Sequence, residues 1–252
     1  RREQAADLIE GDAEEVALAH AMQEHVVHTV LLQDAVQMVE GAERVVARLD
    51  VVPAEFPPGG QRETTVRVDA GAEVALGSPV ARRVARLIDA ATEHLGQIDI
   101  FVANAGIGTT HGLDASEADW ARSWDVNVMA HVRAARLLVP SWLDRGNGRF
   151  VVTASAAGLL TMLGDAPYSV TKHGAVAFAE WLSATYGNQG IAVHAICPLA
   201  VNTPMYENSG PLRPVLDRDP VIDPDSVAEA LLNAMAAEHF LVLPHPQAAD
   251  YY

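Results

Sequence analysis

Short apolar runs alternate with longer helical stretches along this chain, and that alternation is the feature that most narrows its possible folds. Runs of β-branched and apolar residues, typical of strands, occupy residues 6–9, 26–32, 64–68, 98–103, 148–153, 191–196 and 240–243. Apolar residues at helical spacing occupy residues 13–24, 35–49, 80–95, 115–143, 166–186 and 224–238. Strands separated by helices of this length form βαβ units. The pattern therefore predicts an α/β protein with a single doubly wound, Rossmann-like domain: a parallel sheet of about seven strands with helices on both faces.

Glycine and proline residues mark the boundaries of these elements. Gly96 is expected to cap the helix over 80–95, and Pro140 is the expected place of a break in the long helix over 115–143. Residues 52–61 are rich in proline and glycine and are expected to form a loop. The proline-rich stretch 200–222 is expected to be a second loop, and residues 71–79 are interpreted as a small insertion.

Composition excludes several classes of protein. The 252 residues, half of them hydrophobic, can bury a large core, and a net charge of −16 argues against phosphate contacts with nucleic acid. The single cysteine, Cys197, excludes an intramolecular disulfide and a cysteine-based zinc cluster and favours a reducing, cytoplasmic location. The ten histidines lack metal-ligand spacing, and no apolar run approaches the length of a membrane span. Because the first residue is Arg1 rather than Met, we expect residues to be missing at one or both ends.

In a doubly wound sheet, ligands bind beyond the carboxyl ends of the strands, so the residues just after the strands are the first candidates for chemistry. Small, acidic and hydroxyl side chains gather at these points, and the residues concerned are Gly11, Asp34, Asp69, Asn104, Ser155 and Pro198. Such residues suit a cleft that holds a nucleotide and a substrate.

Tyr168 and Lys172 form a pair of particular interest, because Lys172 is the only lysine in the chain. The predicted helix over 166–186 places the two side chains one turn apart on the same face. An ammonium close to a phenol favours the phenolate, so the pKa of Tyr168 is expected to fall towards the range useful for proton transfer. A surface pair without function is the alternative for these five residues taken alone.

Five motifs in order give the chain a family resemblance. They are Asn104-Ala105-Gly106 after a strand, Asn127 in the next helix, Ser155 after the following strand, Tyr168-x-x-x-Lys172, and the segment 198–203. This set resembles the short-chain dehydrogenase/reductase family of NAD(P)-dependent enzymes, most strongly over residues 98–204. The resemblance implies an oxidoreductase that interconverts an alcohol and a ketone or aldehyde by hydride transfer.

The resemblance also implies a role for each catalytic residue. Tyr168 would be the general acid and base, and Lys172 would lower its pKa and hold the ribose of the nicotinamide. Ser155 would hydrogen-bond the reacting oxygen of the substrate. Asn127 would hold a water that links Lys172 to solvent.

For the cofactor, NAD or NADP, the resemblance assigns a larger set of residues. These are Gly11, Asp34, Asp69, Ala70, Asn104, Ala105, Gly106, Tyr168, Lys172, Pro198, Val201 and Thr203. Asp34 would accept hydrogen bonds from the adenosine ribose, which slightly favours NAD. Val201 and Thr203 would meet the nicotinamide carboxamide, while Leu199 stands where the family usually has glycine.

The loop expected to bind the cofactor's phosphates departs from the family pattern. Of three expected glycines only Gly11 is present, and Glu14 and Glu15 would repel a diphosphate. Three explanations stay open: a lost cofactor loop, a loop upstream of Arg1, or binding with an induced geometry. The alternative functions are accordingly a cofactor-independent lyase that resembles the halohydrin dehalogenases, and a non-catalytic subunit with this fold.

Within the single domain, residues 1–103 would form the dinucleotide-binding half and residues 104–252 the catalytic half. The stretch at about 200–222 would be a substrate lid, and its apolar Met205 and Leu212 favour an apolar alcohol or ketone as the substrate. The family uses its two long helices between subunits, which implies a homo-oligomer, a dimer or a tetramer. The four tryptophans in these helices, Trp120, Trp124, Trp142 and Trp181, belong either to that interface or to the core of one subunit.

Overall fold

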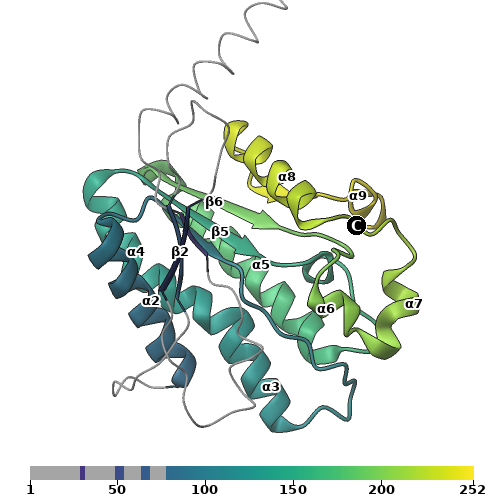
Figure 1. The fold of residues 1–252 in the computed structure, drawn as a ribbon. Helices are drawn as coiled ribbons and strands as arrows, with labels where there is room; N and C mark the ends of the chain where they lie inside the picture. Colours follow the sequence, from purple (N-terminus) through teal and green to yellow (C-terminus); the bar gives the residue numbers. More distant parts are fainter. Residues whose placement is uncertain (1–28, 32–48, 54–63, 69–77) are drawn as a thin grey trace, which may run out of the picture.

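A seven-stranded sheet forms the centre of the molecule. The computed structural model describes residues 29–31, 49–53, 64–68 and 78–252. The strands are β1 (Thr29–Leu31), β2 (Leu49–Pro53), β3 (Thr64–Val68), β4 (Ile100–Ala103), β5 (Gly148–Thr153), β6 (Ile191–Ile196) and β7 (Leu241–Val242). Their order is β2-β3-β1-β4-β5-β6-β7, and every pair is parallel except β2 with β3 (Figure 1). The predicted α/β fold is confirmed, with one antiparallel strand at the edge.

The helices of the described residues follow the strands in alternation. They are α2 (Pro79–Leu95), α3 (Glu117–Trp124), a π-helical segment (Asp125–Met129), α4 (Ala130–Arg145), α5 (Ala166–Tyr186), α6 (Pro204–Glu207), α7 (Arg213–Leu216), α8 (Pro224–Ala236) and α9 (Gln247–Tyr251). Short 3₁₀ turns occur at Ala156–Gly158, Gly187–Gln189 and Gly210–Leu212. None of these helices is long and apolar enough to cross a membrane.

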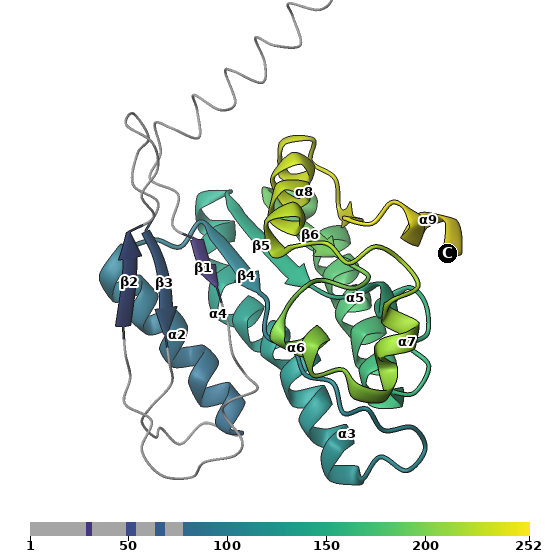
Figure 2. The same cartoon turned by 45° about the vertical axis from the view of Figure 1, so that its right-hand side comes forward.

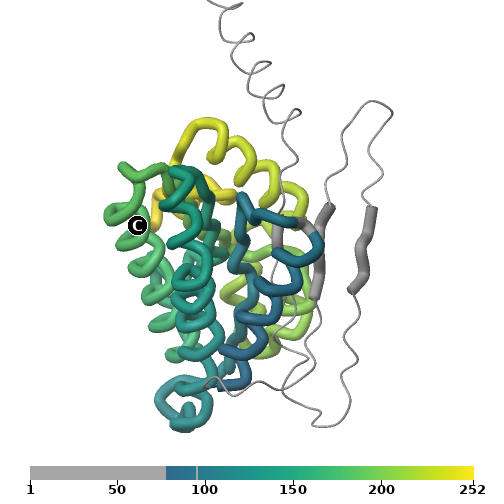
Figure 3. The backbone as a smooth tube through the Cα atoms, turned by 90° about the vertical axis from the view of Figure 1, so that its left-hand side faces the viewer, coloured from purple at the N-terminus to yellow at the C-terminus, as the bar shows by residue number. Residues whose placement is uncertain are grey.

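Helices cover both faces of the sheet, as predicted (Figures 1 and 3). The helices α2, α4 and α5 lie in one layer, and α8 packs on the opposite face. Because successive residues of a strand face opposite sides, Phe150 packs towards the first layer and Val151 towards α8. Phe150 contacts the buried Trp142 of α4 with ring centroids 6.3 Å apart. Burial on both faces is what makes these strands nearly continuous apolar runs.

The region around β2 was predicted wrongly. Residues 35–49 were expected to form a helix and residues 52–61 a loop, yet β2 spans the boundary between them as Leu49–Pro53. Pro53 lacks the N–H that a central strand needs, and β2 lies at the edge of the sheet, where proline is tolerated. The strand expected at 6–9 and the helix expected at 13–24 lie outside the described residues, while the strand expected at 26–32 contains β1.

The long helix breaks at a different place from the one expected. Pro140 lies inside a continuous α4, and the interruption is the π-helical segment Asp125–Met129, where the N–H of Ala130 donates to the carbonyl of Asp125. Pro140 is exposed, so water can bind the carbonyl that its missing N–H leaves free. The break thus falls at Asn127, one of the predicted catalytic residues, and π-helical bulges often occur at functional sites.

Residues 200–222 are not a plain loop but contain the short helices α6 and α7. Figure 2 shows these helices near the carboxyl ends of the central strands, on the side where α9 ends the chain. The guanidinium of Arg213 lies 3.9 Å from the ring centroid of Tyr206. Asp217 accepts hydrogen bonds from both of these side chains, at 2.9 Å and 2.6 Å. These contacts give the predicted lid its own local order.

Candidate active site

The first turns of α5 carry the Tyr168 and Lys172 pair over the carboxyl end of β5. The helix occupies the residues predicted for it, Ala166–Tyr186, and Asp165 is its N-cap residue. The ammonium nitrogen of Lys172 lies 5.6 Å from the ring centroid of Tyr168, so the two side chains share one face of the helix. Lys172 is 3% exposed, which places its charge inside the protein.

Lys172 points to the end of the neighbouring strand. Its Nζ donates a hydrogen bond of 2.8 Å to the carbonyl oxygen of Thr153, the last residue of β5. Burial lowers the pKa of Lys172 to about 8, because removal of water disfavours the charged ammonium. An ammonium has three donors, and Thr153 takes one of them. The remaining donors suit a polyhydroxyl ligand such as a ribose.

The pKa of Tyr168 moves in the opposite direction from the one expected. Burial raises this pKa, a hydrogen bond with the side chain of Ser155 lowers it, and the nearby charges of Asp165 and Cys197 raise it further. Burial has the largest effect because the phenolate loses its hydration. The expected lowering by Lys172 is therefore wrong for this structure, and the contact that favours the phenolate comes from Ser155.

Ser155 is held in place by the backbone on both sides. Its Oγ accepts a hydrogen bond of 3.1 Å from the N–H of Ala157, and its hydroxyl lowers the pKa of Tyr168. The N–H of Ala156 donates to the carbonyl of Pro198 at 2.8 Å, so the segment after β5 is tied to the segment after β6. Two predicted strand-end residues, Ser155 and Pro198, thus lie on adjoining segments.

Asn127 connects the loop after β4 to α5. Its amide accepts from the N–H of Ile107 at 2.8 Å and donates to the carbonyl of Ile107 at 2.9 Å. The same amide donates to the hydroxyl of Thr171 at 2.9 Å, next to Lys172 in the chain. Its side chain is fully buried. These contacts position the segment Asn104-Ala105-Gly106; the water expected at Asn127 stays a prediction.

Gly106 shows how closely this loop approaches the pair. A Cβ atom built on Gly106 would lie 3.0 Å from the Nζ of Lys172 and 3.5 Å from Oδ1 of Asn127. A side chain there would displace the ammonium, so the bare backbone is what lets the loop pass over it. Asn104, Ala105 and Gly106 are therefore brought together with the catalytic candidates, as the strand-end rule predicts.

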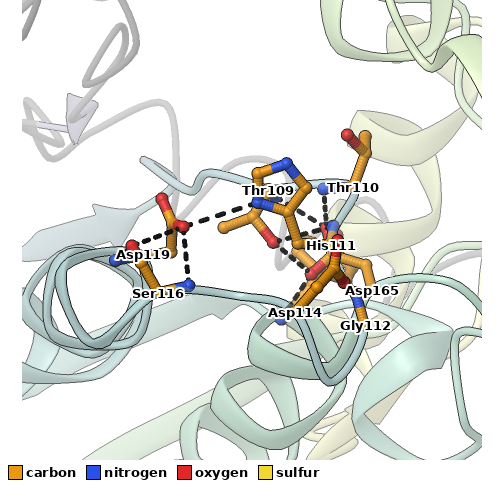
Figure 4. A network of polar contacts seen from close by, with 9 residues as sticks. Thr109, Thr110, His111, Gly112, Asp114, Ser116, Asp119 and Asp165 are labelled. Carbon is orange, nitrogen blue, oxygen red and sulfur yellow. Dashed lines mark hydrogen bonds and ion pairs between the residues drawn. The ribbon is translucent and has the colours of Figure 1, made fainter.

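Asp165 is a residue of this site that the sequence analysis did not identify. Figure 4 shows its carboxylate at the centre of a network that holds the loop after β4. It accepts hydrogen bonds from the N–H and the hydroxyl of Thr109, at 2.6 Å and 2.9 Å, and from the N–H of Thr110 at 2.7 Å. It also caps α5 by accepting from the N–H of Tyr168 at 2.9 Å. The signal available in the sequence was an aspartate just before the Ala-Pro start of a helix.

Asp165→Asn is expected to lower the free energy of unfolding by about 3 kcal/mol, because the amide presents an NH₂ group to a cluster of donors in a site that is 1% exposed. Urea unfolding of the two proteins measures the difference. Asp114→Asn is the matched control, since Asp114 accepts one exposed hydrogen bond from Gly112 and should change stability by no more than about 0.5 kcal/mol. Equal small changes in the two variants would contradict the role given to Asp165.

The segment after β6 carries the other predicted cofactor residues. Val201 pairs with Ile222 in an isolated parallel bridge. The hydroxyl of Thr203 donates to the carbonyl of Val201 at 3.2 Å and caps α6. Pro198, Val201 and Thr203 therefore lie at the carboxyl end of β6, beside the end of β5. Gly11, Asp34, Asp69 and Ala70, together with Glu14 and Glu15, lie outside the described residues.

The described half of the site fits the nicotinamide ribose of a dinucleotide. Lys172 of α5 offers ammonium donors at the end of β5, and Gly106, which follows β4, offers open backbone next to them. Across the described part of the chain, no group of three His, Cys, Asp or Glu side chains is placed to hold a metal ion.

Comparison with known proteins gives a consistent result. A family model described as "short chain dehydrogenase" matches residues 74–213. A protein of Mycobacterium tuberculosis named an uncharacterized NAD-dependent oxidoreductase is 35% identical over 161 residues, which cover 60% of this chain and 58% of that protein. The 1-deoxy-11-beta-hydroxypentalenate dehydrogenase of Streptomyces exfoliatus is 32% identical over 199 residues, 77% of this chain and 69% of that enzyme.

A solved structure is similar as well. The short-chain dehydrogenase/reductase of Burkholderia phymatum, in complex with NAD, aligns with a TM-score of 0.60 and 26% identity, covering 69% of this chain and 71% of that chain. The chain spans only 58% of the length of the mycobacterial relative. The family model covers the part of this chain that contains the site described above.

Proposed function

Because the chain belongs to the short-chain dehydrogenase/reductase family, we propose that it is an NAD(P)-dependent oxidoreductase that interconverts an alcohol and a ketone or aldehyde. The observation that carries this proposal is the convergence of three side chains from two segments. Ser155 faces Tyr168 and lowers its pKa, and Lys172 lies one turn further along the same helix face, buried and charged. The phenol of Tyr168 is thus adjacent to both a hydroxyl and an ammonium, and in this proposal it exchanges the proton with the substrate.

Each residue has a distinct part in the proposed reaction. In the direction of reduction, the phenol of Tyr168 donates its proton to the carbonyl oxygen of the substrate, and in oxidation the phenolate takes a proton from the alcohol. Ser155 donates a hydrogen bond to the same oxygen and stabilises the charge that develops on it. Asn127 holds the loop and α5 in register through Ile107 and Thr171. The nicotinamide, when bound, supplies or accepts the hydride.

Lys172 has two tasks in this proposal. Its ammonium donates to the ribose hydroxyls of the nicotinamide and places a positive charge near Tyr168 during proton transfer. With its pKa lowered to about 8, Lys172 is close to the pH at which it can also pass a proton on. Arginine would not replace it, because a planar guanidinium keeps its proton at this pH.

We propose NAD rather than NADP as the preferred cofactor. Asp34 follows a predicted strand and would repel the 2′-phosphate of NADP. The mycobacterial relative is named NAD-dependent, and the Burkholderia structure contains NAD, which supports the same preference.

The substrate proposed for this site is an apolar alcohol or ketone. Leu212 of the lid supports this proposal. Its methyl group lies so close to Gly164 that a Cβ atom on that glycine would be only 2.7 Å away. The lid therefore packs closely on the loop before α5 with an apolar side chain. In this proposal the lid and that loop close over the substrate, beyond Ser155 and Tyr168.

We propose that the protein acts as a homo-oligomer in the cytoplasm. Trp124 and Trp181, on the outer surfaces of α3 and α5, are 45% and 55% exposed, whereas Trp142 is fully buried. Trp181 stacks on Phe178 at 6.3 Å between ring centroids. Large exposed aromatic side chains on neighbouring helices are suited to contact with a second copy, as a dimer or tetramer.

Titration of the protein with NADH and NADPH tests the proposed function. We expect saturable binding of NADH, followed by calorimetry or by nicotinamide fluorescence, and weaker binding of NADPH. Absence of binding of either cofactor at millimolar concentration would contradict the proposal. That outcome would favour the cofactor-independent lyase or the non-catalytic subunit.

A further inference from the structure

A buried histidine near the end of the chain contacts the segment that follows β6. His245 lies between β7 and α9 and is 1% exposed. Its ring touches the backbone of Leu199 and Ala200, the two residues between Pro198 and Val201. This histidine belongs to none of the motifs in the sequence analysis.

The two hydrogen bonds of His245 define its protonation state. The N–H of Leu199 points at Nδ1 at 3.1 Å, so Nδ1 must accept and carries no proton. Nε2 lies 3.1 Å from the carbonyl oxygen of Ala200, so Nε2 carries the proton and donates it. Only the neutral tautomer with the proton on Nε2 makes both bonds. In an imidazolium, Nδ1 would also carry a proton, and this N–H would point at the N–H of Leu199.

The carbonyl of Ala200 is shared with the base of the lid. It also accepts from the N–H of Ile222 at 3.2 Å, and the carbonyl of Ile222 accepts from the N–H of Asn202 at 2.8 Å. His245 therefore joins three separate pieces: the segment after β6, the strand-like end of the lid, and the C-terminal tail. Nearby, Tyr251 of α9 donates to Asp219 at 2.8 Å, which ties the tail to the lid a second time.

We infer that His245 is a positioning residue whose neutral ring locks the Leu199–Ala200 backbone in the shape that receives the nicotinamide, and that its protonation releases this lock. The inference rests on the proposed function for the identity of the ligand, a nicotinamide dinucleotide. Leu199 stands where the family usually has glycine, and the ring nitrogen of His245 that accepts from its N–H fixes the position of its backbone.

The surroundings of His245 set the sign of the pH effect. Burial lowers its pKa from 6.5, while the nearby carbonyls of Ala200 and Pro220 and the charge of Asp219 oppose that shift. Asp219 is in turn bonded to Tyr251, which also lies near the charges of Arg218 and Asp250. Because the folded pKa is below 6.5, the lock is present at pH 6.5 and above and is lost as the pH falls through that lower pKa.

Two variants of His245 test the two hydrogen bonds of its ring and its titration. His245→Phe keeps a ring of similar size and removes both bonds. His245→Gln supplies one acceptor and one donor but does not titrate. His194→Phe is the matched control, because His194 is also 1% exposed and also bonds two partners, the carbonyl of His239 and Arg149, at the other end of the sheet.

The first measurement needs no cofactor: amide hydrogen exchange at Leu199, followed by NMR at pH 7.5. We expect exchange to be roughly tenfold faster in His245→Phe, the order expected when a buried donor loses its partner, and unchanged in His194→Phe. The second measurement is the Kd for NADH, which we expect to rise about tenfold in His245→Phe and less in His245→Gln. Between pH 7.5 and pH 5.5 the Kd of the natural protein should rise more steeply than that of His245→Gln.

The outcomes are distinct. Unchanged exchange at Leu199 in His245→Phe would overturn the lock whatever the cofactor does. Faster exchange with an unchanged Kd would overturn the role in positioning the cofactor loop. If the natural protein binds no NADH, the proposed function fails, and the exchange at Leu199 still decides whether the lock exists. If His245→Phe does not fold, parallel pH curves for the natural protein and His245→Gln would overturn the inference.

Discussion

Tyr168→Phe is expected to lower turnover about 10³-fold and to leave the Kd for NADH within about twofold, because the variant loses the proton donor alone. Phenylalanine keeps the ring that packs beside Gly108, where a Cβ atom would lie 3.7 Å from Cδ2 of Tyr168. The variant removes only the hydroxyl that meets Ser155. Steady-state rates with NADH and an apolar ketone measure the loss, and calorimetry measures the Kd.

Tyr186→Phe is the control for this experiment. Tyr186 lies at the far end of the same helix, with its ring 6.0 Å from that of Trp181, and has no part in the site. Its variant should keep the turnover of the natural protein. A Tyr168→Phe protein that stayed as active as Tyr186→Phe would show that the proton comes from another group.

Lys172→Met is expected to have effects of opposite sign on activity and stability. Turnover should fall by at least about 10²-fold, because the variant loses the ammonium that is proposed to hold the ribose and to pass a proton on. The free energy of unfolding at pH 7 should rise by up to ~3 kcal/mol, because the pKa shift of Lys172 from 10.5 to about 8 measures the cost of burying its charge. A gain in stability on loss of a catalytic group is typical of active sites.

The same shift predicts how stability depends on pH. Below pH 8 the ammonium is charged in both the folded and the unfolded chain, and the folded protein bears the full cost of its burial. Between pH 8 and 10.5 the unfolded chain binds the proton and the folded chain does not, so the free energy of unfolding rises with pH. Urea unfolding across this range measures the slope.

Lys172→Met should lack the slope, and Lys172→Arg should lack it too, because a guanidinium keeps its proton in both states. Lys172→Arg should also be less stable than Lys172→Met, because it keeps a buried charge. If all three proteins showed the same slope, the lowered pKa of Lys172 would not be its cause.

The bounds of the central elements follow from the amino-acid sequence alone. The strands β5 and β6 and the helix α5 have the bounds predicted for them, because their apolar periodicity agrees with burial on both faces of the sheet. Gly96 ends α2 with a positive φ of 83°, as a glycine after a helix predicts. The order of the motifs also placed Asn104, Ser155, Tyr168 and Lys172 at one edge of the sheet, since parallel strands share their carboxyl ends.

The predictions from the sequence were wrong where the local preference of a residue disagrees with its position in the tertiary structure. Proline at residue 53 indicated a loop, but the edge of the sheet accepts a strand without that N–H. Proline at residue 140 indicated a break, but its exposed position lets α4 continue. In both places, the position in the fold decided the outcome: residue 53 lies in the edge strand of the described sheet and residue 140 on an exposed helix face, and a local pattern specifies neither.

Only the tertiary structure decided the electrostatics and the supports of the site. Burial raises the pKa of Tyr168 although a lysine lies one turn away, and burial is a property of the whole packed domain. Asp165 holds Thr109, 56 residues before it, and His245 holds Leu199, 46 residues before it. The proximity of reactive groups on one helix can be predicted from their spacing in the sequence, because a helix fixes the distance between them. The groups that hold them come from distant segments that meet only when the sheet and its helices have packed.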